Sequence, residues 1–450
     1  MSARETMQSR LGFLMVAAGC AVGLGNVWRF PFIVGRNGGA AFVLVYLFFL
    51  AILGFPLLTA ELAIGRAAKK GIAGAMGALC PPALRRFWTT LGCVIFGGNL
   101  LLMMYYTDVS GWLLRYTGGY ALQGTGFVGA DAGAAFGSLL ADPFTCTAFM
   151  LVSVVVATGV CLLGVQSGVE RVTKTMMLTL LALLGVLAVK SLTLPGAMKG
   201  VAFYLKPDWS PLLAHPFATC FDAMGQAFFT LSIGVGAMTI FGSYCDRAHT
   251  LVTESVWIIV IDTSVALLSG LVIFPACAAF NVDVTAGPGL IFIALPKVFA
   301  SMAGGRFWGA VFFLFLSFAA LTTIIGVFEC LIGGLMDEAK WPRRRAALTV
   351  GLAVAVLSMP AVLGYSVWKD VLPWAGKTVL DVEDFILSQF WLPLGALVTC
   401  LYCTQPFGVD WTGFRNEASA GAGWRLPSAV RPYMRWILPF VLLTVLIGGL

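Results

Sequence analysis

Charge is the scarcest ingredient of this 450-residue chain. Only 11% of the residues are charged and 59% are hydrophobic, with a mean hydropathy of +0.92, whereas soluble domains carry about 25% charge. The only two histidines, His215 and His249, flank apolar runs, and no histidine–carboxylate or Ser–His–Asp grouping falls within such a run. The sequence therefore does not favour a membrane enzyme. No Ser/Gly linker or low-complexity tract divides the chain, which predicts one domain over 1–450.

The eleven cysteines do not indicate a disulfide framework or a zinc site. Most of them, such as Cys20, Cys161 and Cys330, lie inside apolar runs. The basic start of the chain lacks a small-residue cleavage site after its apolar stretch, so we interpret the first apolar run as retained and not as a signal peptide.

Apolar runs of about 20 residues recur along the chain, and each is long enough to cross a bilayer. We predict an all-α membrane protein with eleven transmembrane helices. Their expected positions are about 10–34, 40–66, 87–117, 145–164, 168–190, 217–242, 252–279, 306–336, 346–364, 379–403 and 434–450.

The distribution of basic residues predicts the orientation. With the N-terminus in the cytoplasm, most of the 28 Lys and Arg residues fall in cytoplasmic segments, among them the cluster Arg343–Arg345. Cytoplasmic loops of membrane proteins are enriched in exactly these residues. An odd number of spans then puts the C-terminus outside.

Two of the expected spans carry helix-weakening residues in their middle. Residues 19–31 read GCAVGLGNVWRFP, and residues 230–237, in the sixth span, read TLSIGVGA. Glycine and proline weaken helices, and Asn26 and Arg29 are costly in hydrocarbon. Interrupted segments at corresponding positions of two halves indicate a transporter binding site. The alternative is that the small residues only let helices pack closely.

The second interrupted segment lies in span six, five spans after the first, and because five is odd the two would run in opposite directions. We expect a 5+5 inverted repeat, with repeat one at about 10–190, repeat two at about 217–403 and an extra helix at about 434–450. Unwinding frees backbone groups that hydrocarbon cannot satisfy. Free carbonyls suit a hard cation, and the amides at a half-helix N-terminus suit an anionic group. A zwitterionic amino acid with sodium would satisfy both.

Several longer motifs extend this pattern into a family resemblance. They are SRLGFLMVAAGCAVGLGNVWRFPF, RNGGAAFVLVYL, GFPLLTAELAIGR, MMYYTDVSGW, GQAFFTLSIGVGAMTIFGSY, SFAALTTIIGVFE and LDVEDF. The chain resembles the bacterial members of the neurotransmitter:sodium symporter family over nearly its whole length. The resemblance implies a leucine-transporter-like fold and secondary active transport, namely sodium-coupled import of an amino acid by alternating access. It also implies a location in the plasma membrane, the bacterial inner membrane.

The resemblance implies one or two sodium ions per cycle and oxygen ligands for each. Site one would use the carbonyl of Ala21 and the side chains of Asn26, Thr230 and Asp262. Site two would use the carbonyls of Gly19, Val22 and Ala319 with the hydroxyls of Thr322 and Thr323. Oxygen ligands are those that a hard cation prefers. For the two threonines the alternative is that each hydroxyl bonds back to its own helix.

The residue at position 262 also predicts whether transport requires chloride. Family members that need chloride carry Asn at this position and Ser one turn later, whereas this chain has Asp262 and Ala266. The fixed charge of Asp262 can replace the anion, and Ala266 cannot bind one. We therefore expect no chloride requirement.

The substrate site is expected between the two interrupted spans. The amides of Leu24 and Gly25 and the hydroxyl of Tyr106 would hold the carboxylate. The carbonyls of Ala21, Phe229 and Thr230 would hold the ammonium. The side-chain pocket would be lined by Leu102, Phe229, Ser232, Val235, Thr323 and Val327.

Two features of this pocket predict the class of substrate. Gly23 stands where monoamine transporters carry Asp, which leaves room for a substrate that brings its own carboxylate. The lining contains no charge, and an unpaired buried charge is expensive. We expect a neutral amino acid with a large hydrophobic or aromatic side chain, without ranking tryptophan, tyrosine, leucine and methionine.

Two charged pairs are expected to act as gates. Arg29 and Asp384 would pair across the outer vestibule, and Arg4 and Asp337 would pair at the cytoplasmic mouth, assisted by Tyr244. For Arg4 and Asp337 the alternative is solvated loop charge. Glu61, an acid inside an apolar run, is expected to accept hydrogen bonds from the broken backbone.

The chain departs from the family pattern at one position in span five, and two alternative functions stay open. Many bacterial members carry proline ten residues after the glycine at the start of span five, but counting from Gly168 gives Leu178. The rivals are a proton-coupled transporter of the same fold, for which Lys174 is the candidate residue, and a sensor that has lost transport. The expected partners are an amino acid and the lipid bilayer, with no nucleic acid, and the oligomeric state is open.

Overall fold

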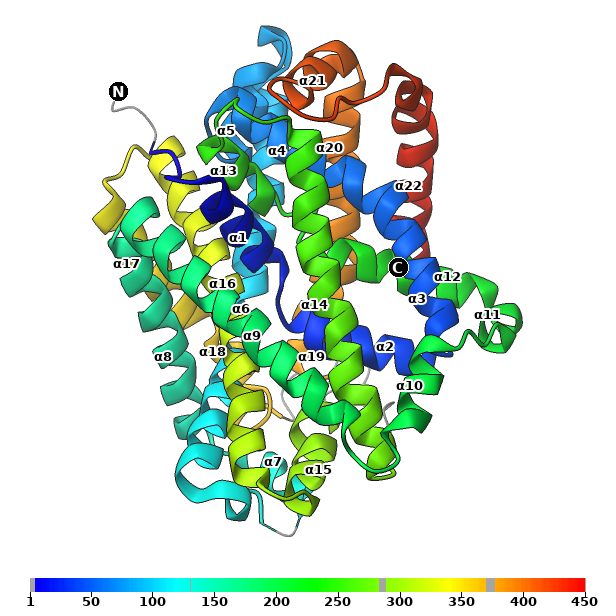
Figure 1. Ribbon diagram of the computed structural model, residues 1–450. Helices are drawn as coiled ribbons and strands as arrows, with labels where there is room; N and C mark the ends of the chain where they lie inside the picture. Colours follow the sequence, from blue (N-terminus) through cyan, green and yellow to red (C-terminus); the bar gives the residue numbers. More distant parts are fainter. Residues whose placement is uncertain (1–4, 130, 283–288, 370–376, 450) are drawn as a thin grey trace.

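Helices make up almost all of the chain in the computed structural model, which describes residues 5–129, 131–282, 289–369 and 377–449. Within these residues the only β-type pairing is a single bridge between His249 and Ala422. Figure 1 shows long helices running between the two ends of the molecule, with short helices at both ends and others, such as α2 and α10, at mid-height.

Nine helical segments in the described residues are long and apolar enough to cross a membrane unbroken. In chain order they are Ala40–Ala68 (α3, Ala40–Phe49, and α4, Phe55–Ala68), Pro82–Phe127 (α6, Arg85–Gln123), Pro143–Leu162 (α8), Val165–Leu192 (α9, Arg171–Leu192), Leu251–Ala279 (α14), Gly305–Glu338 (α16), Arg343–Leu363 (α17, Arg343–Leu357, and α18, Met359–Leu363), Val379–Thr404 (α19, Val379–Phe385, and α20, Leu392–Thr404) and Ser428–Gly448 (α22, Leu438–Gly448). These bounds agree with the expected spans to within six residues, except that the segment Pro82–Phe127 runs ten residues beyond the expected end at 117.

Two further spans are broken at the predicted places. Helix α1 (Arg10–Ala21) is followed by a widened turn at Gly25–Arg29 and then by α2 (Phe30–Arg36), and the two halves meet at a bend of 57°. Helix α12 (Pro216–Thr230) stops before residues 231–236, and α13 (Ala237–Tyr244) resumes the span. Together with the nine unbroken segments of the described chain, these match the eleven expected spans.

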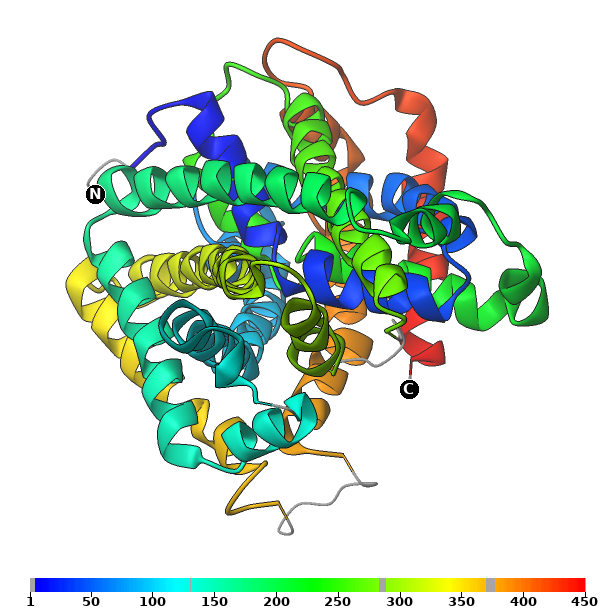
Figure 2. The same ribbon diagram turned by 60° about the horizontal axis from the view of Figure 1, so that its bottom comes forward.

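The broken helices lie inside the bundle and not at its rim. Helix α1 packs against α16, α9 and α14, and α13 packs against α4. At the crossing of α1 and α16, a Cβ added to Gly326 would come within 2.8 Å of Cys20 Cβ. Figure 2, turned by 60° toward the lower end, shows α1 and α2 enclosed by longer helices. The breaks are therefore held in the packed core.

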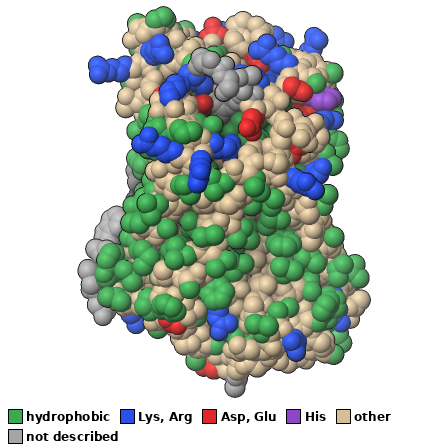
Figure 3. Space-filling model, turned by 90° about the vertical axis from the view of Figure 1, so that its left-hand side faces the viewer, with side chains coloured by type: hydrophobic (Ala, Val, Ile, Leu, Met, Phe, Trp, Pro, Cys, Tyr) green, Lys and Arg blue, Asp and Glu red, His purple; other side chains and the backbone are tan. Residues whose placement is uncertain are grey.

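The surface is banded. Figure 3 shows an uncharged belt of hydrophobic and other side chains around the middle, with most of the visible Lys and Arg toward the upper end. In Figure 1 that end carries the N-terminus, α5 (Ile72–Leu79) and α21 (Asp410–Ala418), and the opposite end carries α7 (Ala132–Leu140) and α15 (Leu295–Ser301). Large apolar side chains such as Val155, Leu352 and Phe440 are exposed, as expected where a helix faces lipid.

The remaining short helices are α10 (Ala197–Leu205) and α11 (Ser210–Ala214), which precede α12. All eleven cysteines are free thiols. Cys400 and Cys403 form a C-x-x-C pair on α20, but both are buried and unbonded. Within the described residues no group of three or more His, Cys, Asp or Glu side chains could hold a metal. The repeat boundaries and the cytoplasmic N-terminus stay predictions.

Candidate substrate and ion site

The gap between α1 and α2 is held open by side chains that bind its freed backbone. The amide of Gly23 donates to Asn26 Oδ1 (3.1 Å), and the amide of Leu24 donates to the hydroxyl of Tyr106 (2.9 Å). The amide group of Gln226 on α12 donates to the carbonyl of Gly25 (3.0 Å). Unsatisfied backbone groups are costly in hydrocarbon, so these contacts stabilise the break.

Glycine at position 23 is required by space. A Cβ there would lie 2.4 Å from the hydroxyl of Tyr106 and 2.7 Å from Oγ1 of Thr323, which is closer than real Cβ contacts. The absence of a side chain at Gly23 therefore lets α6 and α16 approach the broken backbone of α1.

The break between α12 and α13 is held in the same way. Glu61 on α4 accepts a 2.7 Å hydrogen bond from the amide of Gly234, as the sequence predicted. Asn99 on α6 donates to the carbonyl of Val235 (2.6 Å). Ser232, Gly234 and Gly236 have φ of 50°, 96° and 70°, a left-handed region that a helix does not use.

Three of the residues expected at sodium site one form a buried polar cluster. The amide nitrogen of Asn26 donates to Thr230 Oγ1 (3.0 Å), to the carbonyl of Asp262 (3.1 Å) and to Asp262 Oδ1 (2.8 Å). The hydroxyl of Thr230 donates to Asp262 Oδ2 (2.9 Å). All three side chains are fully buried. The cluster joins the broken part of the first span, the end of α12 and the middle of α14.

A second polar cluster gathers four of the five residues expected at site two. The hydroxyl of Thr323 on α16 lies 3.2 Å from the carbonyl of Val22, 3.3 Å from that of Ala319 and 3.5 Å from that of Gly19. The hydroxyl of Thr322 instead bonds back to the carbonyls of Phe318 and Ala319, both at 3.0 Å. The hydroxyl of Thr322 thus bonds back to its own helix, which is the alternative to sodium binding that the sequence left open.

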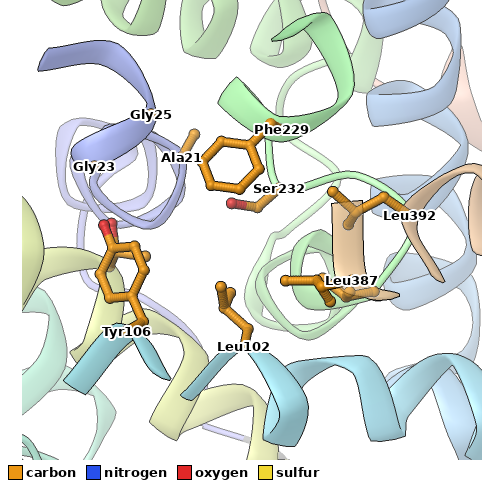
Figure 4. Close-up of a pocket in the computed structure, with 11 residues that line it drawn as sticks. Ala21, Gly23, Gly25, Leu102, Tyr106, Phe229, Ser232, Leu387 and Leu392 are labelled. Carbon is orange, nitrogen blue, oxygen red and sulfur yellow. The ribbon is translucent and has the colours of Figure 1, made fainter. Parts of the chain in front are cut away.

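A cavity of about 20 Å³ separates the two broken spans. Figure 4 shows Tyr106 and Leu102 of α6 facing Phe229 and Ser232, the latter two at the break between α12 and α13. The full lining is Ala21, Gly23, Gly25, Leu102, Tyr106, Phe229, Ser232, Val235, Thr323, Leu387 and Leu392. Three expected site residues, Leu24, Thr230 and Val327, are not part of it.

The sequence argument missed Leu387 and Leu392 as lining residues. Both belong to the span Val379–Thr404, where a widened turn at Ile386–Trp391 precedes α20. An apolar residue in an apolar run carries no signal of its own. The only sequence feature that marked this part of the span was Pro393, which follows Leu392 at the start of α20.

A larger vestibule of about 330 Å³ adjoins the cavity. Phe229, Tyr106 and Gly25 line both spaces, so the ring of Phe229 stands between them. The guanidinium of Arg29 lies 4.4 Å from the centre of that ring. Phe229 therefore covers the cavity on the vestibule side, and Arg29 covers Phe229.

Arg29 reaches Asp384 through a third residue. Its Nη1 donates to the hydroxyl of Ser388 (3.2 Å), and that hydroxyl donates to Asp384 Oδ1 (3.2 Å). Tyr105 on α6 also donates to Asp384 Oδ1 (2.8 Å). Within the described residues the two charges do not form a direct ion pair. Ser388, which the sequence argument missed, bridges them.

The opposite end is closed by contacts that are partly unexpected. Arg4 lies outside the described residues, and Asp337 accepts a 2.8 Å hydrogen bond from the amide of Gly71. Tyr244 donates to the buried Glu329 (2.6 Å), which also pairs with Arg343. The only sequence signal for Glu329 was an acid inside the apolar run of span eight.

The segment before α1 is fastened to the start of span five. Glu170 accepts hydrogen bonds from the backbone amides of Gln8 (2.7 Å) and Ser9 (3.2 Å) and from the hydroxyl of Ser9 (3.0 Å). Glu5 in turn accepts from the amide of Val165 (3.0 Å). Span five begins with a widened turn at Val165–Glu170, so it departs from regular helix although it lacks the proline that many bacterial members carry.

Comparison with known proteins agrees with this architecture. The model of the sodium:neurotransmitter symporter family matches residues 4–121 and 137–450. An uncharacterized sodium-dependent transporter of Bacillus subtilis (strain 168), YhdH, is 37% identical over 89% of this chain and 88% of its own. An uncharacterized sodium-dependent transporter of Haemophilus influenzae is 30% identical over 99% of this chain and 98% of its own.

A solved structure supports the fold in detail. The crystal structure of MhsT in complex with L-phenylalanine superposes with a TM-score of 0.89, at 34% identity and with both chains covered completely. The fold class predicted from the sequence, a leucine-transporter-like bundle with two unwound helices, is thereby confirmed. The chain belongs to the sodium:neurotransmitter symporter family and is a sodium-dependent symporter, a multi-pass membrane transporter of a small-molecule substrate and not an enzyme.

Proposed function

We propose that the protein imports a neutral amino acid with a large hydrophobic or aromatic side chain, driven by sodium through alternating access. The observation that carries this proposal is the cavity itself. It joins the broken ends of α1 and α12, which present backbone amides and carbonyls, to an uncharged lining. MhsT, of the same fold, was crystallised with L-phenylalanine.

The two ends of the substrate would bind different backbone groups. The amides of Leu24 and Gly25 and the hydroxyl of Tyr106 would bind the carboxylate. Gly25 and Tyr106 line the cavity, and the amide of Leu24, which is outside the lining, donates to the hydroxyl of Tyr106. The carbonyls of Ala21, Phe229 and Thr230 bind the ammonium. Charged side chains are excluded, because no residue of the lining offers an opposite charge.

Sodium would bind at the two polar clusters. At site one, Asp262 supplies a full negative charge, with Thr230, Asn26 and the carbonyl of Ala21. To present its oxygen, Asn26 has to turn its side-chain amide, since its nitrogen now faces Asp262. At site two, Thr323 and the carbonyls of Gly19, Val22 and Ala319 form the ligand set, and Thr322 joins by rotating its hydroxyl away from its own helix.

Transport would not require chloride. Asp262 is buried at the cluster, so its negative charge is fixed where an anion would otherwise be needed. One turn along α14, Ala266 has no group that could bind an anion. Replacing chloride by gluconate should leave the uptake rate unchanged, and a large loss of rate would refute this part of the proposal.

The N-terminus would lie in the cytoplasm, with the protein in the bacterial inner membrane. The gathering of Lys and Arg at the end that carries the N-terminus supports this orientation. The vestibule above Phe229 then faces outward. Arg29 and Asp384 form the outer gate, and Asp337, Arg4 and Tyr244 form the inner gate.

Uptake into proteoliposomes tests the proposal. Radiolabelled phenylalanine, tryptophan, leucine, glutamate and lysine should be compared with and without an inward sodium gradient. We expect sodium-dependent accumulation of the apolar and aromatic amino acids only. Sodium-independent uptake, or preferred uptake of glutamate or lysine, would contradict the proposal.

A matched pair of variants distinguishes loss of the sodium site from general damage to the fold. Thr323→Val removes the hydroxyl that faces three carbonyls while keeping the shape of the side chain, and should raise the sodium concentration needed for uptake. Thr117→Val, on α6 and outside both polar clusters, removes a hydroxyl that bonds to the hydroxyl of Ser317 and to the carbonyl of Leu113. It should leave the sodium dependence unchanged.

A further inference from the structure

Asp108 is a buried acid that the transport scheme does not use. It lies on α6 shortly after Tyr106, and its side chain is fully buried. Neither of its carboxyl oxygens has a hydrogen-bond partner. The indole of Trp112, one turn further along α6, faces it without completing a hydrogen bond. A carboxylate left in this condition is expensive.

A second buried acid lies on α19, which packs against α6. Glu383 on α19 is 7% exposed, its Oε2 is buried without a partner, and it is close enough to Asp108 for their charges to repel. The other titratable groups on which the charge of Asp108 acts are Cys146 of α8 and Tyr365, which follows α18. Among the described residues, no Lys, Arg or His forms an ion pair with either acid.

These observations indicate that a bound ligand would stabilise both acids. Two ionised carboxylates cannot share a dry interface, because each disfavours the charge on the other. A proton on one of them removes a charge and with it the repulsion between the two acids. We propose that Asp108 and Glu383 form a proton-binding site between α6 and α19, and that the bound proton holds the two helices together.

The position of the pair connects it to the outer gate. Asp384, next to Glu383 in the chain, accepts a 2.8 Å hydrogen bond from Tyr105 of α6. The acid pair and this bond therefore join the same two helices beside the vestibule. Loss of the proton places two negative charges across that contact, so α19 moves away from α6 and the vestibule opens. Acid outside the cell thus favours the closed vestibule.

Infrared spectroscopy tests the proton directly and needs neither sodium nor an amino acid, so it stands apart from the proposed function. The purified protein in lipid should show the carbonyl stretch of a protonated carboxyl that is lost in Asp108→Asn/Glu383→Gln. Asp208→Asn, an exposed acid on a surface loop, should keep it. An unchanged carboxyl band in the double variant would overturn the proposal.

Transport supplies the second readout. With saturating sodium and labelled phenylalanine, wild-type uptake should fall about threefold or more when the external pH is lowered from about 8 to about 6, since one proton changes a population by at most about tenfold per unit. The double variant should show a flattened profile, and Asp208→Asn should follow the wild type. A double variant with the wild-type pH profile would overturn the coupling to the gate. Because both substitutions keep the side-chain shape, we expect a folded protein, and Glu383→Gln alone provides the same comparison.

Discussion

Replacing Asp262 by Asn tests the central electrostatic claim about sodium site one. The carboxylate accepts one hydrogen bond from Asn26 at Oδ1 and one from Thr230 at Oδ2, and it is fully buried. An amide of the same shape keeps one acceptor and replaces the other by a donor. The substitution therefore removes the negative charge and one charge-assisted contact while the packing stays the same.

The magnitude follows from that loss. A hydrogen bond to a charged group contributes about 1.5–3 kcal/mol, and a tenfold change in affinity corresponds to about 1.4 kcal/mol. We therefore expect the sodium concentration for half-saturation to rise about tenfold to a hundredfold in Asp262→Asn. The same change should create a chloride requirement when Ala266→Ser is added, since the added hydroxyl can bind an anion one turn away.

The assay can use sodium alone. Binding to the folded state raises the thermal midpoint as the ligand concentration rises, so the midpoint should be titrated with sodium chloride and, for ionic strength, with choline chloride. Asp222→Asn is the matched control, because Asp222 accepts a 2.9 Å hydrogen bond from Asn37 outside the cluster. A folded Asp262→Asn with a half-saturation within about twofold of the wild type would refute the reasoning.

Three other variants have definite expected outcomes. Gly23→Ala places a Cβ 2.4 Å from the hydroxyl of Tyr106, and because overpacking costs about 1–3 kcal/mol, phenylalanine binding measured by equilibrium dialysis should weaken about tenfold or more. Phe229→Ala removes the ring between cavity and vestibule, so phenylalanine should dissociate several-fold faster in a washout assay while half-saturation by sodium changes little. Glu329→Gln keeps an acceptor for Tyr244 but leaves the paired arginine without its counter-charge. Since breaking a buried ion pair costs about 3–5 kcal/mol, its thermal midpoint should fall.

The breaks in spans one and six could be predicted because they violate a local rule in the sequence. A cluster of glycines with Asn26 and Arg29 inside an apolar run has no place in an ordinary membrane helix. Asp262 and Glu61 stood out for the same reason, as acids deep in hydrocarbon. The structure brings Asn26 and Asp262 together and places Glu61 on the second break. Local anomalies in sequence thus marked the residues near the middle of the bundle.

What could not be predicted depends on contacts between distant segments. Leu387 and Leu392 line the cavity only because their span turns irregularly beside it. Ser388 bridges the outer gate, and Glu329 finds its arginine on the next span. Leu387, Leu392 and Ser388 are not unusual in their own runs, and Glu329, although an acid in an apolar run, carries no sign of its partner. Their roles arise from how helices pack, which a single sequence does not encode in any local pattern.

The intramolecular hydrogen bonds at the two breaks also explain how sodium and substrate can be coupled. Asn26 joins both: its oxygen accepts from the amide of Gly23, and its nitrogen donates to Asp262. Under the proposed function, a sodium ion bound by Asp262 would make Asn26 turn its amide, and this would free the amide of Gly23 at the wall of the cavity. A substrate carboxylate placed beside that amide and the amide of Leu24 would then become its acceptor. Each ligand completes contacts that the other has opened, and such coupling is reciprocal by thermodynamic necessity. Sodium should therefore raise the affinity for the amino acid by the same factor as the amino acid raises the affinity for sodium.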